Sequence, residues 1–210
     1  MKKKKIKAII FDVNGVLAMD KDKKSSVHES VHESMAKVLD VHLDTWFDAI
    51  DTTYAKSIEG KGTKEGVIKR IADNLDVRTE KLQKLLVKHY RRGFRRNWHL
   101  YKIAWKLKRR GYKIAILSDQ WHVSKDVFIR EKDERKFDVS VISCDVGMRK
   151  PNPKIYRLTL KKLKVKPSEA VFIDNRDWNT KPAKKLGIKT ILFENNNQCL
   201  KELRKMGVRI

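Results

Sequence analysis

Five short runs of apolar, mostly β-branched residues place the strongest constraint on how this chain folds. Each run is nearly continuous rather than alternating, which is typical of strands that are covered on both faces of a parallel sheet. Amphipathic segments separate the later runs, and two of these segments end at Gly111 and Gly187. Strands that alternate with helices predict βαβ units and a doubly wound parallel α/β sheet. The predicted strands span residues 6–11, 113–117, 139–143, 170–173 and 189–193, and the predicted helices span 99–110, 155–163 and 180–186.

The first strand is followed by roughly ninety residues before the next strand, which far exceeds the usual length of a crossover connection. Residues 25–92 read as several helices, with Asp44, Thr63 and Thr79 as candidate N-caps. We therefore expect a helical insert at 19–92, and a Rossmann-like core formed by 1–18 and 93–210.

The aromatic and histidine residues of this insert allow two interpretations each, a structural role or contact with a ligand. Trp46, Phe47 and Tyr54 repeat at helical spacing, which favours a role in the core of the insert over contact with a ligand. His28 and His32 lie four residues apart and so share one helix face. A metal site is conceivable there, but we expect both imidazoles to be solvated.

The chain of 210 residues carries 50 Lys+Arg against 26 Asp+Glu, a formal net charge of +24. Scattered lysine favours solvated helix faces over a nucleic-acid footprint, although residues 88–98 alternate basic and aromatic side chains and keep nucleic acid open as a partner. No apolar stretch predicts a membrane span. Cys144 and Cys199 lack ligand spacing, so we expect two reduced thiols in a cytoplasmic protein, as a monomer or homodimer.

Polar residues follow the predicted strands at the points where the strands end. Asp12 comes after the first strand, Ser118 and Asp119 after the second, and Asp174 after the fourth, while Lys150 lies a short distance beyond the third. In a parallel sheet, ligands bind beyond the carboxyl ends of the strands. An aspartate alone is a common turn residue. The ordered set predicts a site on one rim of the sheet, built around Asp12.

The motifs that contain these residues resemble those of the haloacid dehalogenase superfamily of hydrolases, in the branch with a helical cap after the first strand. The resemblance covers almost the whole chain. It rests on IIFDVNGVL at 9–17, ILSD at 116–119, VGMRKPNPKIY at 146–156 and VFIDN at 171–175, followed at the family's spacing by Asn179, Ala183 and Leu186-Gly187.

The resemblance implies a role for each residue of the set. Asp12 would be the nucleophile that forms an aspartyl-phosphate, Ser118 would bind the phosphoryl oxygens, and Lys150 would neutralise the gathered negative charge. Mg²⁺, which needs oxygen ligands, is the implied cofactor. The implied sets are Asp12, Asn14, Ser118 and Lys150 for catalysis, Gly15, Ser118, Asp119 and Lys150 for phosphate, and Asp12, the main-chain carbonyl of Asn14, Asp174 and Asn175 for the metal.

Two positions depart from the common phosphatase pattern. Asn14 stands where the family has the aspartate that acts as general acid and base, a contribution worth about 10²–10⁴ in rate. Asn175 stands at the second carboxylate of the usual pair, so metal affinity should fall unless Asp174 or Asp177 substitutes. A smaller change is Asp119, where an asparagine is usual.

Three interpretations follow from these departures. The first is a phosphatase for small phosphorylated metabolites, such as anomeric sugar phosphates, whose leaving oxygen needs little protonation. The second is a metal-independent carbon–halogen hydrolase, because a halide leaves without an acid. The third is a protein that has lost catalysis and binds a phosphorylated ligand or nucleic acid.

Overall fold

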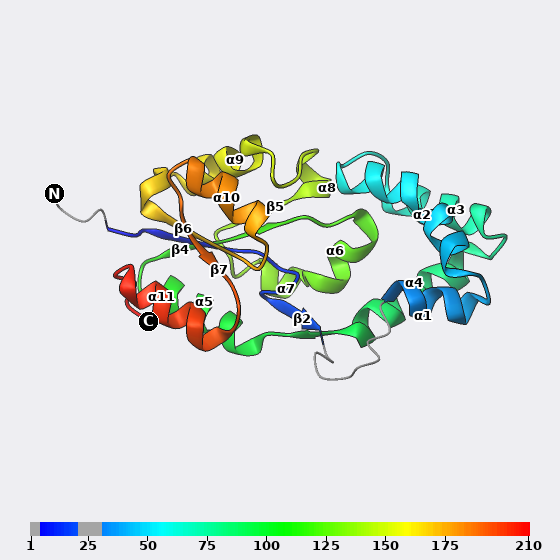
Figure 1. Cartoon of the computed structure of the whole chain (residues 1–210), viewed down its shortest axis with the longest axis horizontal. Coiled ribbons are helices and arrows are strands. Elements are labelled where there is room, and N and C mark those ends of the chain that lie inside the picture. Colours follow the sequence, from blue (N-terminus) through cyan, green and yellow to red (C-terminus); the bar gives the residue numbers. More distant parts are fainter. Residues whose placement is uncertain (1–4, 21–30) are drawn as a thin grey trace.

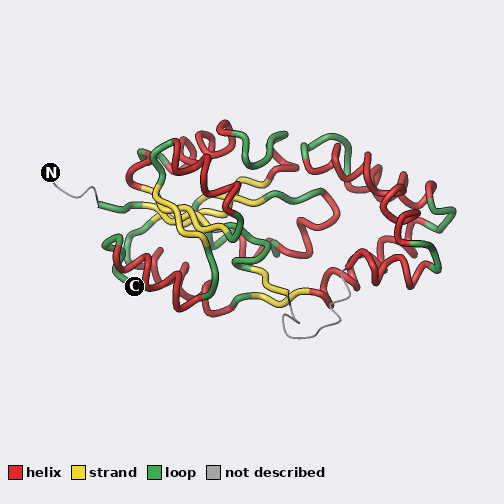
Figure 2. The backbone as a smooth tube through the Cα atoms, in the orientation of Figure 1, coloured by secondary structure: helices red, strands yellow, loops and turns green. Residues whose placement is uncertain are grey.

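The computed structural model describes residues 5–20 and 31–210. A parallel sheet of five strands in the order β5-β4-β1-β6-β7 forms the centre of the larger part of the molecule (Figures 1 and 2). The doubly wound α/β fold and all five predicted strands are confirmed. The strands are β1 (Ala8–Phe11), β4 (Lys113–Ser118), β5 (Val139–Ile142), β6 (Ala170–Asp174) and β7 (Lys189–Leu192).

Helices cover both faces of the sheet, as nearly continuous apolar strands require (Figure 1). Two apolar clusters result, one on each face of β1: Ile9 and Phe11 belong to one, and Ala8 and Ile10 to the other. The helices of the core are α5 (Trp98–Arg109), α6 (His122–Phe128), α7 (Glu131–Glu134), α8 (Ser143–Val146), α9 (Pro153–Leu163), α10 (Asp177–Lys185) and α11 (Asn196–Lys205), with a 3₁₀ turn at Pro167–Glu169. Helices α9 and α10 pack on one face, and α5 and α11 on the other.

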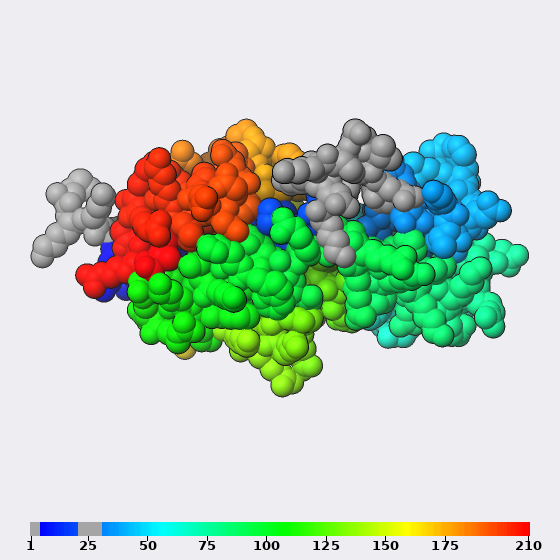
Figure 3. All heavy atoms as spheres, turned by 90° about the horizontal axis from the view of Figure 1, so that it is seen from below, coloured from blue at the N-terminus to red at the C-terminus, as the bar shows by residue number. Residues whose placement is uncertain are grey.

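The described part of the long interval after β1 forms helices, as predicted. They lie together at the end of the molecule remote from the sheet, coloured blue to teal in Figures 1 and 3. Their apolar faces bury Trp46, Ile71 and Leu82 between them. These helices are α1 (Val31–Leu39), α2 (Leu43–Ile58), α3 (Lys64–Asn74) and α4 (Thr79–Gly93).

Of the three predicted N-caps of these helices, one is confirmed. Thr63 caps α3, and its Oγ1 accepts from the Gly66 N–H at 3.1 Å. Asp44 was the wrong choice for α2, because the side chain of His42 accepts from the Asp44 N–H and Asp44 lies inside the first turn. Thr79 is the first helical residue of α4 and follows Arg78, whose side chain makes no capping bond.

A short antiparallel ribbon connects the insert to the core. It pairs β2 (Ala18–Asp20) with β3 (Phe94–Arg96), just where the chain leaves and re-enters the core. Neither strand was predicted, because three residues are too few to show a period. The predicted boundaries at 18–19 and 92–93 fall in or beside this ribbon, and the division into two domains stays a prediction.

No helix among the described residues is long and apolar enough to cross a membrane.

Candidate active site

A buried ion triad lies at the carboxyl end of the central strands. The ammonium of Lys150 donates to Asp12 Oδ1 at 2.9 Å and to Asp174 Oδ2 at 2.7 Å. The three side chains are between 0 and 7% exposed. The structure therefore brings together three residues that lie far apart in the sequence, and water hardly screens the attraction between them.

The fold places each member of the triad. Asp12 follows β1 directly and Asp174 is the last residue of β6, and these two strands are hydrogen-bonded neighbours. Lys150 comes from the loop between α8 and α9. The carboxylate of Asp119, next to the end of β4, anchors that loop by accepting the Lys150 N–H at 3.0 Å. The predicted phosphate ligand Asp119 thus has a structural task that places the lysine.

Burial and charge set the protonation of the triad. Burial raises the pKa of the Asp12 carboxyl to about 6, and the Lys150 ammonium opposes that rise. For Lys150, burial works against the charge, but the carboxylates of Asp12 and Asp174 outweigh it and raise its pKa above the usual value. At neutral pH Asp12 is an ionised carboxylate beside a fixed cation, which is the form that can attack an electrophile.

The second carboxylate of the triad is fully engaged by protein groups. Asp174 Oδ1 accepts the Arg176 N–H at 2.8 Å, and Oδ2 accepts from Asn179 Nδ2 at 3.0 Å in addition to Lys150. Asn179 was noted in the sequence only for its spacing. These bonds fix Asp174 as the partner that orients Lys150, and a share of Asp174 in metal binding stays a prediction.

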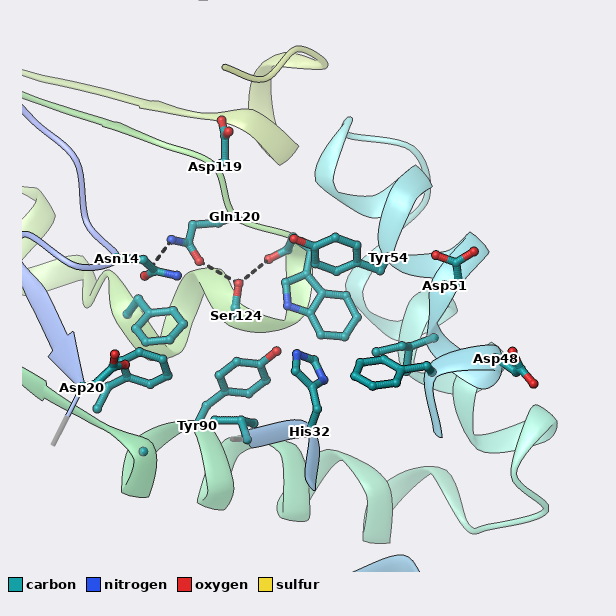
Figure 4. Close-up of a pocket in the computed structure, with 17 residues that line it drawn as sticks. Asn14, Asp20, His32, Asp48, Asp51, Tyr54, Tyr90, Asp119, Gln120 and Ser124 are labelled. Carbon is teal, nitrogen blue, oxygen red and sulfur yellow. Dashed lines mark hydrogen bonds between the residues drawn. The ribbon is translucent and has the colours of Figure 1, made fainter. Parts of the chain in front are cut away.

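Gln120 is a site residue that the sequence did not reveal. Its buried Oε1 accepts from Ser124 Oγ at 2.7 Å, so its Nε2 is the donor that reaches Asn14 Oδ1 at 3.2 Å (Figure 4). The same Nε2 also reaches Ser118 Oγ at 3.0 Å. Because the carbonyl oxygen of the Asn14 amide is taken by this bond, its NH₂ group is the end that can face a ligand. Nothing in the motif around Ser118 marks a glutamine two residues later as functional.

Gly15 has a role different from a simple phosphate contact. Its N–H donates to the Ala18 carbonyl at 2.7 Å, and its φ of 85° suits glycine. A Cβ at this position would lie 2.2 Å from Asn175 Nδ2. The missing side chain therefore lets Asn175 pack against the loop that follows Asp12, and binding of phosphate by Gly15 stays a prediction.

The donor chemistry beside Asp12 fits a hard divalent cation. The candidate ligands all offer oxygen atoms: the second carboxylate oxygen of Asp12, the main-chain carbonyl of Asn14 and the side-chain carbonyl of Asn175. Asn175 lies against the loop that carries the other two. Among the described residues no group of three or more His, Cys, Asp or Glu forms a ready cation cage. Mg²⁺ keeps several waters and needs only one or two carboxylates, so the set is compatible with it.

A cavity of about 710 Å³ opens beside this site, between the core and the insert. Asn14, Asp119 and Gln120 line its core end, and the rest of the lining combines aromatic residues with three further aspartates and a few aliphatic residues (Figure 4). The expectation that Trp46, Phe47 and Tyr54 form the core of the insert holds for buried Trp46 only. Phe47 and Tyr54 are 43% and 37% exposed and face the cavity.

His32 also lines the cavity, and the expectation that it is solvated was wrong. Its Nδ1 accepts from Trp46 Nε1 at 3.0 Å, and its ring lies 5.4 Å from the ring of Phe47. Tertiary contacts across the helices, which the four-residue spacing cannot show, bury half of it. His28 lies outside the described residues.

The basic cluster at residues 88–98 forms part of a second hollow, of about 400 Å³, which is lined in part by β3. Its guanidinium groups come from Arg91, Arg95, Arg96 and Arg130. Arg96 and Arg130 share the buried carboxylate of Asp133. Burial is the largest cause that lowers the pKa of Arg96, and the positive charge of Arg130 is the next. Such a decrease is expected where like charges lie close together.

Both cysteines are free and buried, in agreement with two reduced thiols.

Comparison with known proteins gives a consistent picture. Bifunctional epoxide hydrolase 2 of Mus musculus is 31% identical over 77% of this chain, and D-ribitol-5-phosphate phosphatase of Bacteroides thetaiotaomicron is 27% identical, covering 94% of this chain and 97% of that protein. This chain spans less than half the length of the mammalian epoxide hydrolases it matches.

Among solved structures, the HAD family enzyme bt-2542 of Bacteroides thetaiotaomicron in complex with magnesium and inorganic phosphate has a similar fold. Its TM-score is 0.71 at 21% identity, with 90% of this chain and 94% of that chain covered. The family model of haloacid dehalogenase-like hydrolases matches residues 6–187, most of the chain. The chain therefore belongs to the haloacid dehalogenase-like hydrolases.

Proposed function

We propose that this hydrolase is a phosphomonoesterase that acts through an aspartyl-phosphate on a small phosphorylated metabolite, such as a sugar phosphate. The observation that carries the proposal is the buried Asp12 carboxylate, which is held by Lys150 at 2.9 Å. A buried nucleophile beside a fixed cation is suited to a dianionic phosphate, whose charge would otherwise repel it. The relative that is a D-ribitol-5-phosphate phosphatase supports the same class of substrate.

The reaction would run in two displacements at phosphorus. In the first, Asp12 attacks the phosphorus and the bond to the leaving oxygen breaks. That oxygen departs with the bonding electrons as an alkoxide or phenoxide and takes a proton from water. Lys150 and the Ser118 hydroxyl stabilise the charge on the equatorial oxygens. In the second, water attacks the phosphorus and returns Asp12 as a free carboxylate, together with inorganic phosphate.

Asn14 determines which alcohols can leave. Its amide donates a hydrogen bond but transfers no proton, and Gln120 keeps its NH₂ end available for that bond. An ordinary alkoxide departs slowly without a proton, whereas an anomeric, acyl or phenolic oxygen is less basic. We therefore propose that turnover is efficient only for esters of such leaving groups.

Magnesium belongs to the proposal as a cofactor. Asp12, the carbonyl of Asn14 and Asn175 would hold it, with Asp174 as a further candidate, and it would neutralise charge on the phosphoryl oxygens. The magnesium complex of the similar bt-2542 enzyme supports this choice for the family.

A substrate panel tests the proposal. Anomeric sugar phosphates, other sugar phosphates and an aryl phosphate are assayed with Mg²⁺, using the wild type and the variants Asp12→Ala and Asn14→Asp. We expect turnover by the wild type and none by Asp12→Ala. Turnover that is unaffected by Asp12→Ala refutes the nucleophile, and no turnover in either wild type or Asn14→Asp refutes the phosphatase. Halide release from 2-chloropropionate in EDTA would instead favour the carbon–halogen hydrolase.

A second candidate function is the binding of nucleic acid, favoured by the hollow that carries four arginines. Arg96 and Arg130 share the carboxylate of Asp133, so Arg91 and Arg95 are the groups that would contact phosphate, and phosphate neutralisation makes such binding salt-dependent. Single-stranded oligonucleotide should then bind the wild type, weaken steeply with salt, and lose affinity on Arg91→Glu/Arg95→Glu. The matched control is Lys161→Glu/Lys162→Glu on α9. Equal binding by both double variants eliminates this function.

A further inference from the structure

Among the described residues, six aromatic side chains line the cavity beside Asp12. The rings of Tyr54 and Trp121 lie 5.4 Å apart at 61°, and those of Tyr90 and Phe128 lie 5.7 Å apart at 85°. Phe47 and Phe94 complete the aromatic wall. These side chains come from the insert, the ribbon and α6, so they converge only in the folded chain. A volume of about 710 Å³ is that of a site for a ligand far larger than phosphate.

The cavity is lined by acidic side chains, whereas the chain as a whole is strongly basic. Among the described residues that line it there are four aspartates, Asp20, Asp48, Asp51 and Asp119, and no lysine or arginine. Arg149 and Arg176 flank Lys150 and Asn175 in sequence and do not line the cavity, but they are close enough to lower the pKa of Tyr54 against the effect of burial. Among the described residues that line the cavity, a second anion on the ligand would therefore meet carboxylates and no cationic side chain.

His32 offers one directed hydrogen bond inside this cavity. An indole N–H can only donate, so the Nδ1 that accepts from Trp46 carries no proton and the neutral ring holds its proton on Nε2. Burial lowers the pKa of His32 and keeps the ring in that neutral form. Figure 4 shows the ring beside Tyr90, reaching into the cavity toward the side of Tyr54.

At the core end, hydrogen bonds within the protein take up the side chain of Gln120 and the carbonyl oxygen of the Asn14 amide. Gln120 is bonded to Ser124, Ser118 and Asn14. A flat apolar group needs stacking surfaces and few hydrogen bonds, and the aromatic rings of the cavity supply such surfaces.

From these contacts we propose that the cavity holds the organic half of the substrate, which is the phosphomonoester of a flat, apolar alcohol or phenol without a second anionic group. His32 Nε2 donates to one acceptor atom of that group and so acts as a specificity residue. The inference rests on the proposed phosphatase function, but among small phosphorylated metabolites it selects apolar phosphomonoesters in place of the sugar phosphates named there.

Non-hydrolysable phosphonates test this class without relying on turnover. Calorimetry on the wild type with Mg²⁺ compares methylphosphonate, naphthylmethylphosphonate, quinolinylmethylphosphonate, a carboxylated naphthylmethylphosphonate and the phosphonate analogue of a sugar phosphate. We expect the naphthyl ligand to bind at least about tenfold more tightly than methylphosphonate, because burying an aromatic ring contributes at least that factor. The quinoline should gain a further few-fold, and the carboxylate should lose about tenfold.

Variants assign the effect to the cavity. Phe47→Ala should weaken the naphthyl ligand about fivefold or more and leave methylphosphonate unchanged, whereas Val38→Ala, at an equally exposed apolar residue of the insert outside the cavity, should change neither. His32→Phe keeps the ring stacking and should remove the preference for the quinoline, with thermal melting as the check on folding.

The outcomes distinguish a wrong substrate class from a wrong phosphatase function. If methylphosphonate binds and the naphthyl ligand gains nothing, or if the sugar phosphonate binds more tightly than the naphthyl ligand, the substrate class is wrong while the phosphatase stands. If neither inorganic phosphate nor any phosphonate binds, the proposed function fails and the inference falls with it.

Discussion

Replacing Lys150 with methionine removes the only charge in the described triad that balances Asp12 and Asp174. At an effective dielectric constant of about 20, ion contacts of 2.9 and 2.7 Å correspond to roughly 6 kcal/mol each before desolvation. Desolvation of the buried ions offsets most of this, but removing one partner leaves the other charges buried without compensation. Such losses amount to about 3–5 kcal/mol of unfolding free energy, and we expect that range for Lys150→Met at pH 8.

The loss should depend on pH with a definite sign. The pKa of Asp12 is raised to about 6 in the folded protein, and removing the cation raises it further. A carboxyl with a raised folded pKa contributes stability that is present below its unfolded pKa and is lost as the pH rises through its folded pKa. At pH 5 the variant should therefore recover about 1–2 kcal/mol, since each pKa unit corresponds to about 1.4 kcal/mol.

Urea unfolding in EDTA at pH 5 and pH 8 measures both effects, with Lys162→Met on the exposed face of α9 as the control. The control should stay within about 0.5 kcal/mol of the wild type at either pH. If Lys150→Met is as stable as the control at pH 8, or loses more stability at pH 5 than at pH 8, the account of a charge-balanced buried triad is wrong.

Three further predictions concern other residues. Asn14→Asp should raise kcat for ordinary sugar phosphates by about 10² or more and change aryl phosphates little, because only alkoxide departure needs the proton; equal gains for both classes would contradict this. Asn175→Asp should lower the Mg²⁺ concentration needed for half-maximal activity, measured by metal titration, since it restores a charged ligand; an unchanged midpoint would remove residue 175 from the metal site. Burial raises the pKa of Cys144 to about 11 and of Cys199 to about 12, so native protein at pH 8 should react with a thiol reagent at less than about 1% of the rate of unfolded protein, and fast labelling of folded protein would refute it.

The sheet could be predicted from the sequence because its strands are buried on both faces. Runs such as Ala8–Phe11 and Ala170–Asp174 are apolar at nearly every position, and this signal does not depend on distant contacts. The site residues at the strand ends could be predicted because the strands themselves could be located. The parallel order brings Asp12 and Asp174 to one rim once the strands are known.

The cavity was not readable, because it depends on how the insert meets the core. Helical spacing shows that Phe47, Tyr54 and His32 lie on helix faces, but not which faces point at the core. The role of Gln120 likewise comes from a bond to Asn14 across 106 residues. The short ribbon of β2 and β3 fixes this relation, and its strands are too short to carry a period.

The central claim is that Asp12 takes the phosphoryl group, and trapping that intermediate tests it most directly. Enzyme and a ³²P-labelled phosphomonoester, chosen from the panel for measurable turnover, are mixed and quenched in acid within the first turnover, and the labelled peptide is mapped by mass spectrometry. We predict a label at Asp12 that is sensitive to hydroxylamine and absent in Asp12→Ala. Turnover with no covalent label, or a label on another residue, would contradict the account.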